Sequence, residues 1–353
     1  PRRPPRSDPQ RTPARGVAMG GAYWTYLAKR LGQFGLVVFI GITITFLVTH
    51  LTPIDPVEQT ISAAASFGST SPEAIAMLRL SLSELYGVQG NLWDQYLVFW
   101  GRVLVGDFGP SLSAFPTPVS TLILRALPWT IGLLLTATLI SWFIGNLLGG
   151  LAGYYRNSLP LRLVGVVAMG LHPIPYYIVA FVLLVVFGYL WPILPIAGGS
   201  QMNLQPGFTL PFILSVLEHS ILPALSLVLV GIGSWFMGMR ALVSNIVTDD
   251  HVVFAELAGV PERRIVTSYV MRNALVPQVT GLAMSLGAIF NGAIITEEVF
   301  GYPGIGSLLI DAVHAGDYSL VLGVTTVSIL AVSVAVLAID LLYPLLDPRV
   351  RVG

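Results

Sequence analysis

The sequence of 353 residues contains no cysteine. Disulfide bonds, zinc–thiolate sites, iron–sulfur clusters and cysteine nucleophiles are therefore excluded. Histidine is also sparse, and its residues do not show the spacing of a metal site such as His-x-x-x-His. The scattered histidines include His50, His219, His251 and His314. We expect no resident metal in this chain.

Charged residues are scarce as well. They make up 10% of the chain, while hydrophobic residues make up 54%; a soluble domain carries roughly 25% charged residues. The formal net charge is zero and the basic residues cluster at a few places, so no broad cationic face is available for nucleic acid. The composition indicates a protein whose solvent is the lipid bilayer, without a nucleic-acid partner.

The chain has one lysine, Lys29, and no glycine-rich loop precedes it. A Walker A phosphate-binding loop requires Gly-x-x-x-x-Gly-Lys-Ser/Thr. The chain therefore cannot hydrolyse ATP by that route. Any ATP-driven role requires a partner chain, and no cofactor is expected in this one.

Apolar runs are long enough to cross a bilayer. The first, residues 31–51, has the length that a hydrocarbon core of about 30 Å requires at about 1.5 Å per residue. A signal peptide would have an apolar region of about 7–15 residues before a small-residue cleavage site, whereas Thr-Pro-Ile-Asp-Pro follows here at 52–56. We interpret this run as an uncleaved span. The preceding residues 1–28, rich in Pro and Arg, predict a disordered cytoplasmic tail.

Further apolar stretches bring the prediction to an all-α membrane protein with six transmembrane helices. They lie at residues 129–152, 163–190, 221–240, 276–296 and 319–343. The 18 Lys and Arg residues fall on one side of the predicted bilayer, apart from Arg79, Arg102 and Arg125. By the positive-inside rule both termini are cytoplasmic, which predicts a multi-pass protein of the cell (inner) membrane.

The loop between the first two spans, residues 52–128, is too long to be a mere connector. Ser-Pro-Glu at 71–73 is a helix start, with Ser as N-cap and Pro at the first helical position. A second amphipathic stretch runs over residues 92–105, with aromatic residues at helical spacing. We predict a small helical extracytoplasmic region that lies on the outer face of the bundle.

The cytoplasmic segment 248–277 is the most informative loop. Thr248 is expected to cap a short helix with an acidic first turn, and Gly259 to end it in a left-handed backbone conformation. Pro-Glu at 261–262 opens a second helix. The prediction is a short helix over 249–258 that projects from the bundle and can transmit force to a docked partner. An ordinary interfacial helical hairpin is the alternative.

This segment resembles the signature cytoplasmic loop of binding-protein-dependent ATP-binding-cassette permeases. That pattern runs Glu-Ala-Ala, three residues, Gly, and a longer gap to an Ile-x-Leu-Pro-like end, which Ala-Glu-Leu-Ala-Gly at 255–259 and Asn-Ala-Leu-Val-Pro at 273–277 match in part. Leu257 and Ala258 depart from it. The resemblance implies a set of residues that couple to the ATPase: Ala255, Glu256, Leu257, Ala258, Gly259, Arg263 and Arg264.

Other stretches resemble the dipeptide and oligopeptide branch of that superfamily. They are Leu-Thr-Pro-Ile-Asp-Pro at 51–56, Gly-Asp-Phe-Gly at 106–109, Leu-Pro at 127–128, Phe-Gly-Tyr-Pro-Gly-Ile-Gly at 300–306 and Tyr-Pro-Leu-Leu-Asp-Pro-Arg at 343–349. The resemblance covers residues 24–351, and so a six-span permease domain over 29–351. It implies a complex with a second homologous permease subunit, two ATPase subunits that bind ATP and Mg²⁺, and an extracytoplasmic substrate-binding protein.

Polar residues within the spans are candidates for a translocation path, because they are costly in lipid. His172, in a His-Pro-Ile-Pro sequence that breaks the third span, and Asn291 in the fifth are the two that we single out. The alternative is that they bond neighbouring helices. Glu297 and Glu298 are interpreted as a solvated helix end, and Gly-x-x-x-Gly at 145–149 as a packing face. In the family that this chain resembles, the segment from Tyr302 to His314 helps to shape the outer gate.

The sequence lacks the features of two other classes of membrane protein. An intramembrane protease would need a buried nucleophile or paired acids in mid-membrane, and a self-sufficient secondary transporter usually has an ionisable relay there. No predicted span has a charge near its middle. The best interpretation is an import permease for small neutral oligomers that works by alternating access. Residues 273–286 favour oligosaccharide by their likeness to sugar-type members, with oligopeptide close behind and free Ni²⁺ a poor fit.

Overall fold

The computed structural model describes residues 18–51, 57–58, 61–62, 72–85, 90–287 and 294–346. Within these ranges the chain is predominantly helical, as the sequence predicts. Four helices are long and apolar enough to cross a membrane: the first helix from Trp24 to Leu51, Val119–Tyr154, Leu210–Ile246 and the last helix from Tyr318 to Leu341. A fifth span is added if one bent pair of helices counts as one.

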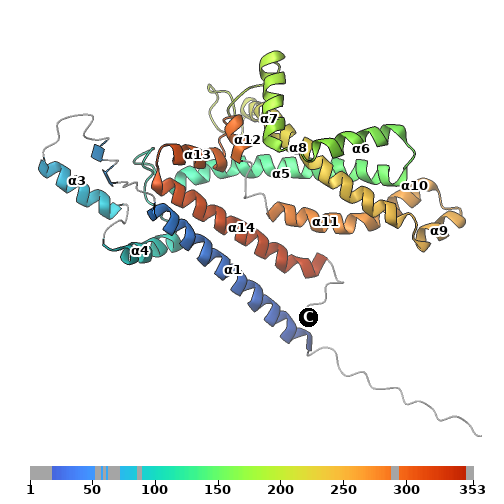
Figure 1. Ribbon diagram of the computed structural model, residues 1–353, viewed down its shortest axis with the longest axis horizontal. Coiled ribbons are helices and arrows are strands. Elements are labelled where there is room, and N and C mark those ends of the chain that lie inside the picture. Colours follow the sequence, from blue (N-terminus) through green and yellow to red (C-terminus); the bar gives the residue numbers. More distant parts are fainter. Residues whose placement is uncertain are drawn as a thin grey trace, which may run out of the picture.

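Helix α1 (Ala18–Leu51) runs beside α14 (Tyr318–Leu346) along one side of the molecule (Figure 1). The helix begins within residues 1–28, so the boundary predicted for the disordered tail is wrong. A contact with α14 helps to explain why α1 begins before residue 29. The Tyr26 hydroxyl donates a 2.7 Å hydrogen bond to the carbonyl oxygen of Asp340. The Pro- and Arg-rich residues 1–17 lie outside the described residues.

The centre of the fold is the pair α5 (Val119–Tyr154) and α8 (Leu210–Ile246). These helices approach so closely at Gly149 that a Cβ there would lie 2.4 Å from the carbonyl oxygen of Phe236. Small residues permit such close packing in membranes, where van der Waals contact drives helix association. The interpretation of Gly145 and Gly149 as a packing face is confirmed.

The third predicted span is two helices that meet at 103°. Helix α6 (Leu159–Leu171) ends before Pro173, and α7 (Tyr176–Leu184) continues into the π-helix η1 (Val185–Leu190). Proline removes a backbone donor and is unfavourable within a helix. His172 keeps a helical backbone, and the chain leaves the helical conformation at Pro175, whose ψ is 134°. The predicted break is confirmed; α7 points away from α6 in Figure 1.

The fifth predicted span, 276–296, is only partly within the described residues. Helix α11 (Arg272–Gly287) forms its first part, and α12 (Ile294–Val299) begins close to its end. Residues 288–293 between them, which include Asn291, lie outside the described ranges. The described helices therefore account for five predicted spans in full or as a bent pair, and the count of six stays a prediction.

Both helices predicted in the long first loop are present. Helix α3 spans Pro72–Leu85 and α4 spans Leu92–Val105. Asn91 caps α4 by accepting hydrogen bonds from the backbone N–H groups of Trp93 and Asp94. Helix α4 packs on α1 through aromatic side chains, with the rings of Tyr96 and Phe46 5.2 Å apart. These helices lie at the end of α1 where α14 begins (Figure 1).

The remaining helices gather at the two ends of α5. At the end near Tyr154 lie α9 (Asp250–Leu257), α10 (Glu262–Arg264) and the π-helix η2 (Ile265–Met271), which leads into α11. At the Val119 end lies α13 (Ile305–His314), with α12 nearby (Figure 1). The two regions singled out by sequence, 248–277 and 297–314, are thus at opposite ends of the same helix.

Candidate functional site

The inner face of α9 is fixed to the bundle by apolar packing. Val252 and Ala255 are buried, with 0% and 6% of their surface exposed. They belong to one cluster with Met239 and Val243 of α8 and Val270 of η2. Because protein interiors are close-packed and deform little, α9 and the ends of α8 and η2 form one packed unit.

The C-terminal end of α9 has a defined turn. Gly259 has a φ of +71°, in the left-handed region. Its N–H donates to the Glu256 carbonyl at 3.0 Å, and the Val260 N–H donates to the Ala255 carbonyl at 3.1 Å. These two bonds form a Schellman motif, in which glycine is favoured because it has no Cβ. The left-handed glycine predicted from sequence is confirmed.

The start of α9 differs from the prediction by one residue. The N-cap is Asp249, while the Thr248 hydroxyl donates 2.7 Å to the Asn245 carbonyl at the end of α8. Thr248 was assigned wrongly because its hydroxyl closes the preceding helix. Asn273 of α11 links this region to η2, since its side-chain nitrogen lies 3.2 Å from His251 Nε2 and 2.7 Å from the Tyr269 carbonyl.

The outer face of α9 carries apolar side chains that no other part of the described chain covers. Phe254 is 71% exposed, Leu257 80% and Val253 42%. Asp250, His251 and Glu256 are exposed on the same helix, so these apolar side chains form a patch bordered by polar residues. Glu256 lies on this exposed side of the chain, and Arg263 and Arg264 of α10 are exposed next to it in sequence. Leu257, which departs from the family pattern, is thus part of the uncovered face, and Phe254 is a member that sequence reasoning missed.

A second polar site lies at the opposite end of α5, around Glu297. This carboxyl group is fully buried. It accepts hydrogen bonds from the Thr130 hydroxyl at 2.7 Å, from the Gly306 N–H at 2.6 Å and from the Ser307 N–H at 3.3 Å. Burial raises the pKa of this carboxyl group, and the three hydrogen bonds act in the opposite direction. The interpretation as a solvated helix end is wrong for Glu297, although its neighbour Glu298 is exposed.

Glu297 replaces a side-chain cap at the start of α13. The N-cap residue is Gly304, which has no side chain to offer, and Glu297 accepts from the N–H groups of the first turn instead. A Cβ on Gly304 would lie 2.3 Å from the Glu297 carboxyl carbon. Close packing around this buried acid therefore explains why a glycine stands at position 304.

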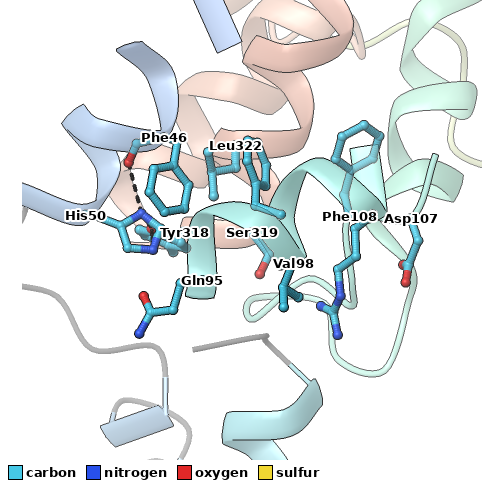
Figure 2. A pocket seen from close by; sticks show the side chains of 11 residues that line it. Phe46, His50, Gln95, Val98, Asp107, Phe108, Tyr318, Ser319 and Leu322 are labelled. Atoms are coloured by element: carbon cyan, nitrogen blue, oxygen red, sulfur yellow. Dashed lines mark hydrogen bonds between the residues drawn. The ribbon is translucent and has the colours of Figure 1, made fainter. Parts of the chain in front are cut away.

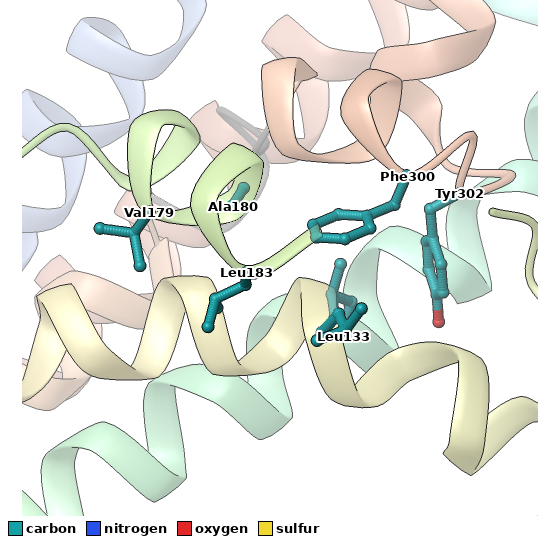
Figure 3. Close-up of a cluster of buried hydrophobic side chains, with 7 residues drawn as sticks. Leu133, Val179, Ala180, Leu183, Phe300 and Tyr302 are labelled. Carbon is teal, nitrogen blue, oxygen red and sulfur yellow. The ribbon is translucent and has the colours of Figure 1, made fainter. Parts of the chain in front are cut away.

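The residues before α13 fill the core at this end. Phe300 and Tyr302 are buried in a cluster with Leu133 of α5 and Leu183 of α7 (Figure 3). The Tyr302 hydroxyl lies 3.0 Å from the hydroxyl of Ser220 on α8. The segment 300–306 thus connects α5, α7 and α8.

Asp317, one residue before α14, is a second fully buried acid that sequence reasoning missed. Its carboxylate accepts 2.9 Å and 2.8 Å hydrogen bonds from the N–H and the hydroxyl of Ser113, and also bonds the hydroxyl of Ser111. It accepts a further 3.0 Å bond from the N–H of Leu320. Asp317 joins the start of α14 to the end of the first loop.

Of the two predicted path residues, His172 lies within the described ranges. His172 is exposed at the end of α6, where Gly233 of α8 leaves room for it: a Cβ on Gly233 would lie 2.6 Å from His172 Cβ. Asn291 lies outside the described residues. Whether either lines a path stays a prediction.

A small cavity lies between α1, α4 and the start of α14 (Figure 2). Its volume is about 40 Å³, and none of the residues that line it comes from α6 or α7. His50 and Tyr318 both line this cavity, and a hydrogen bond joins their side chains. It has room for only a few water molecules, so it is too small for an oligomeric substrate.

The chain is similar to known proteins over most of its length. Residues 145–352 match the family described as binding-protein-dependent transport system inner membrane component. The chain is 30% identical to the probable D,D-dipeptide transport system permease protein DdpB of Escherichia coli, over 94% of this chain and 98% of that one. It is 24% identical to the dipeptide transport system permease protein DppB of Lactococcus lactis, over 92% and 99%. It is 27% identical to the oligopeptide transport system permease protein AppB of Bacillus subtilis, also over 92% and 99%.

Proposed function

The chain belongs to the family of binding-protein-dependent transport system inner membrane components, and we propose that it imports short peptides together with a second, homologous permease. It is a multi-pass membrane protein, a permease subunit of an ATP-binding-cassette importer of the peptide branch. The family consists of transport proteins, not enzymes. In the proposal, two separate ATPase subunits bind ATP and Mg²⁺, and an extracytoplasmic binding protein delivers the substrate.

The observation that carries this proposal is that α9 has apolar side chains both on its buried face and among its exposed residues. Its inner face is buried on the bundle, and its outer face presents Phe254 and Leu257 to solvent. Exposed apolar patches bordered by polar residues are typical of protein interaction sites. We infer that this outer face docks into an ATPase subunit, with Glu256, Arg263 and Arg264 at the polar edge of the contact.

The packing of α9 supports a route for the coupling. The side chains of Val252 and Ala255 contact residues of α8 and η2, and the Schellman turn at Gly259 fixes the direction in which the chain leaves the helix. Movement of the ATPase would displace α9 and with it the ends of α8 and η2. Alternating access then follows from a tilt of these helices relative to α5.

The orientation in the membrane follows from the basic residues. Arg156, Arg240, Arg263, Arg264 and Arg272 all lie near the α9 end of the bundle in the fold, and the positive-inside rule places that end in the cytoplasm. The same rule places α3, α4 and α13 outside. Arg156 also braces this end, since its guanidinium donates 2.5 Å to the Ser244 carbonyl.

The peptide assignment rests on the relatives, whose names are those of dipeptide and oligopeptide permeases. The absence of charge near the middle of the predicted spans fits a neutral, polar path, in which His172 and Asn291 are the candidate lining residues. Peptides therefore take precedence over the oligosaccharides that residues 273–286 suggest.

Uptake by vesicles that hold the complete complex and its own binding protein tests the proposal. Radiolabelled short peptides, neutral oligosaccharides and Ni²⁺ are offered with and without ATP on the ATPase side. Peptide uptake that depends on ATP is expected. Uptake of oligosaccharide without peptide would contradict the peptide assignment, and uptake of Ni²⁺ alone would contradict the neutral path.

A further inference from the structure

A lateral groove separates α1 from α14 on the cytoplasmic half of the pair. The two helices touch at Gly41, where a Cβ would lie 3.1 Å from Ile329 Cγ2. They meet again at an ion pair, in which Arg30 Nη1 lies 3.1 Å from Asp340 Oδ2. Between these two contacts the helices leave a groove with a volume of about 330 Å³.

The walls of this groove are mainly apolar. They are formed by Gln33, Phe34, Val37, Val332, Ser333, Val336 and Leu337, with Arg30 and Asp340 at one end. A single water requires about 10–15 Å³ and several polar partners, so the groove is large enough for many waters but offers them few hydrogen bonds. An apolar occupant suits these walls better than water.

The charged end of the groove carries an excess of positive charge. Arg30 is paired with Asp340, and its guanidinium carbon lies 5.3 Å from the centre of the Tyr26 ring. Lys29, the preceding residue, is exposed and adds a second positive charge. The two basic residues thus outnumber the single carboxylate of Asp340. Both basic residues stand at the start of the uncharged stretch 31–51, the level at which lipid headgroups lie. Basic residues in this position attract anionic lipids.

We propose that this groove binds an anionic phospholipid. Its phosphate lies at Lys29 and Arg30, and one acyl chain runs along Phe34 and Val37 on α1 and Val336 on α14. The groove is closed at both ends by helix contacts and open to the side, which suits a flexible chain that enters from the bilayer. The lipid fills the space between the Gly41 contact and the Arg30–Asp340 ion pair, and it therefore sets the spacing of the two helices there.

Photolabelling of the complete complex in lipid nanodiscs tests this site. The nanodiscs contain phosphatidylglycerol with a photoreactive group in one acyl chain or, in a parallel sample, phosphatidylcholine with the same group. Peptide mapping is expected to find label on residues 33–37 and 332–337, with phosphatidylglycerol favoured. Equal labelling by the two lipids would overturn the headgroup assignment.

Variants separate the headgroup from the acyl chain. Lys29→Gln leaves the ion pair intact and should lower phosphatidylglycerol labelling about fivefold, the factor that corresponds to about 1 kcal/mol per basic residue at an anionic surface. The double variant Arg30→Gln/Asp340→Asn removes the ion pair without leaving a lone carboxylate and should lower it at least as much. Unchanged labelling in both variants would contradict a phosphate site.

Two valines of α14 provide a matched pair for the acyl chain. Val336 lines the groove and is 48% exposed, whereas Val334 does not line it and is 54% exposed. Val336→Trp should fill the groove and remove the label there, and Val334→Trp should leave it. Equal loss of label in both variants would overturn the proposal. A photo-crosslinking amino acid at Val37 that reaches the second permease in place of lipid would also overturn it.

Discussion

The hydroxyl of Thr130 donates a 2.7 Å hydrogen bond to the buried carboxylate of Glu297, which joins α5 to the start of α13. Glu297 also accepts from two N–H groups of α13. One acid thus holds three elements at the end of the bundle that we place outside. The predictions for this end follow from the cost of leaving buried donors without an acceptor.

Glu297→Ala removes the acceptor of these three bonds and should lower the thermal stability of the purified complex. A buried donor left without an acceptor costs about 1–3 kcal/mol. The matched control is Glu298→Ala, which changes the adjacent, exposed carboxylate. Equal melting temperatures for the two variants would contradict the structural role of Glu297.

Asp317→Asn should weaken the connection between the first loop and α14. The amide replaces one acceptor oxygen with a donor, so either the Ser113 N–H or the Leu320 N–H loses its acceptor. Hydrogen exchange of residues 107–118 should become faster, and the same substitution at exposed Asp311 should have no effect there. No change at Asp317 would show that the buried carboxylate is dispensable.

Gly259→Val should impair transport much more than membrane insertion. No atom lies within 4 Å of a Cβ at this position, so the effect comes from the positive φ and not from crowding. Backbone strain of this kind costs about 1–3 kcal/mol, and Gly259→Asn should be milder because Asn tolerates the left-handed region. Gly101→Val, in a helix with open space around it, is the control. Normal uptake by the Gly259→Val variant would argue against the turn as part of the relay.

Single cysteines test the orientation of the bundle, since the chain has none of its own. Met202→Cys, at a fully exposed position, should react with an impermeant thiol reagent in intact cells, and Asn157→Cys should not. Labelling of position 157 from outside would show that the bundle has the opposite orientation.

Local sequence signals predicted the local structure well. The range of α4, the left-handed Gly259 and the break at Pro173 all follow from short patterns, and the structure has each of them. Glu297 and Asp317 were missed because their partners, Thr130 and Ser111, lie far away in the sequence. An acid next to Glu298 looks solvated until the fold brings a hydroxyl and two N–H groups around it. The extension of α1 likewise depends on a distant contact, between Tyr26 and Asp340.

The docking of α9 on an ATPase subunit is the central claim. A photo-crosslinking amino acid at Leu257, which is 80% exposed, tests it in the complete complex, with Val313 of α13, 59% exposed, as the control at the other end. The account predicts a crosslink from position 257 to an ATPase subunit and none from position 313. A crosslink from position 257 only to lipid or to the second permease would contradict it.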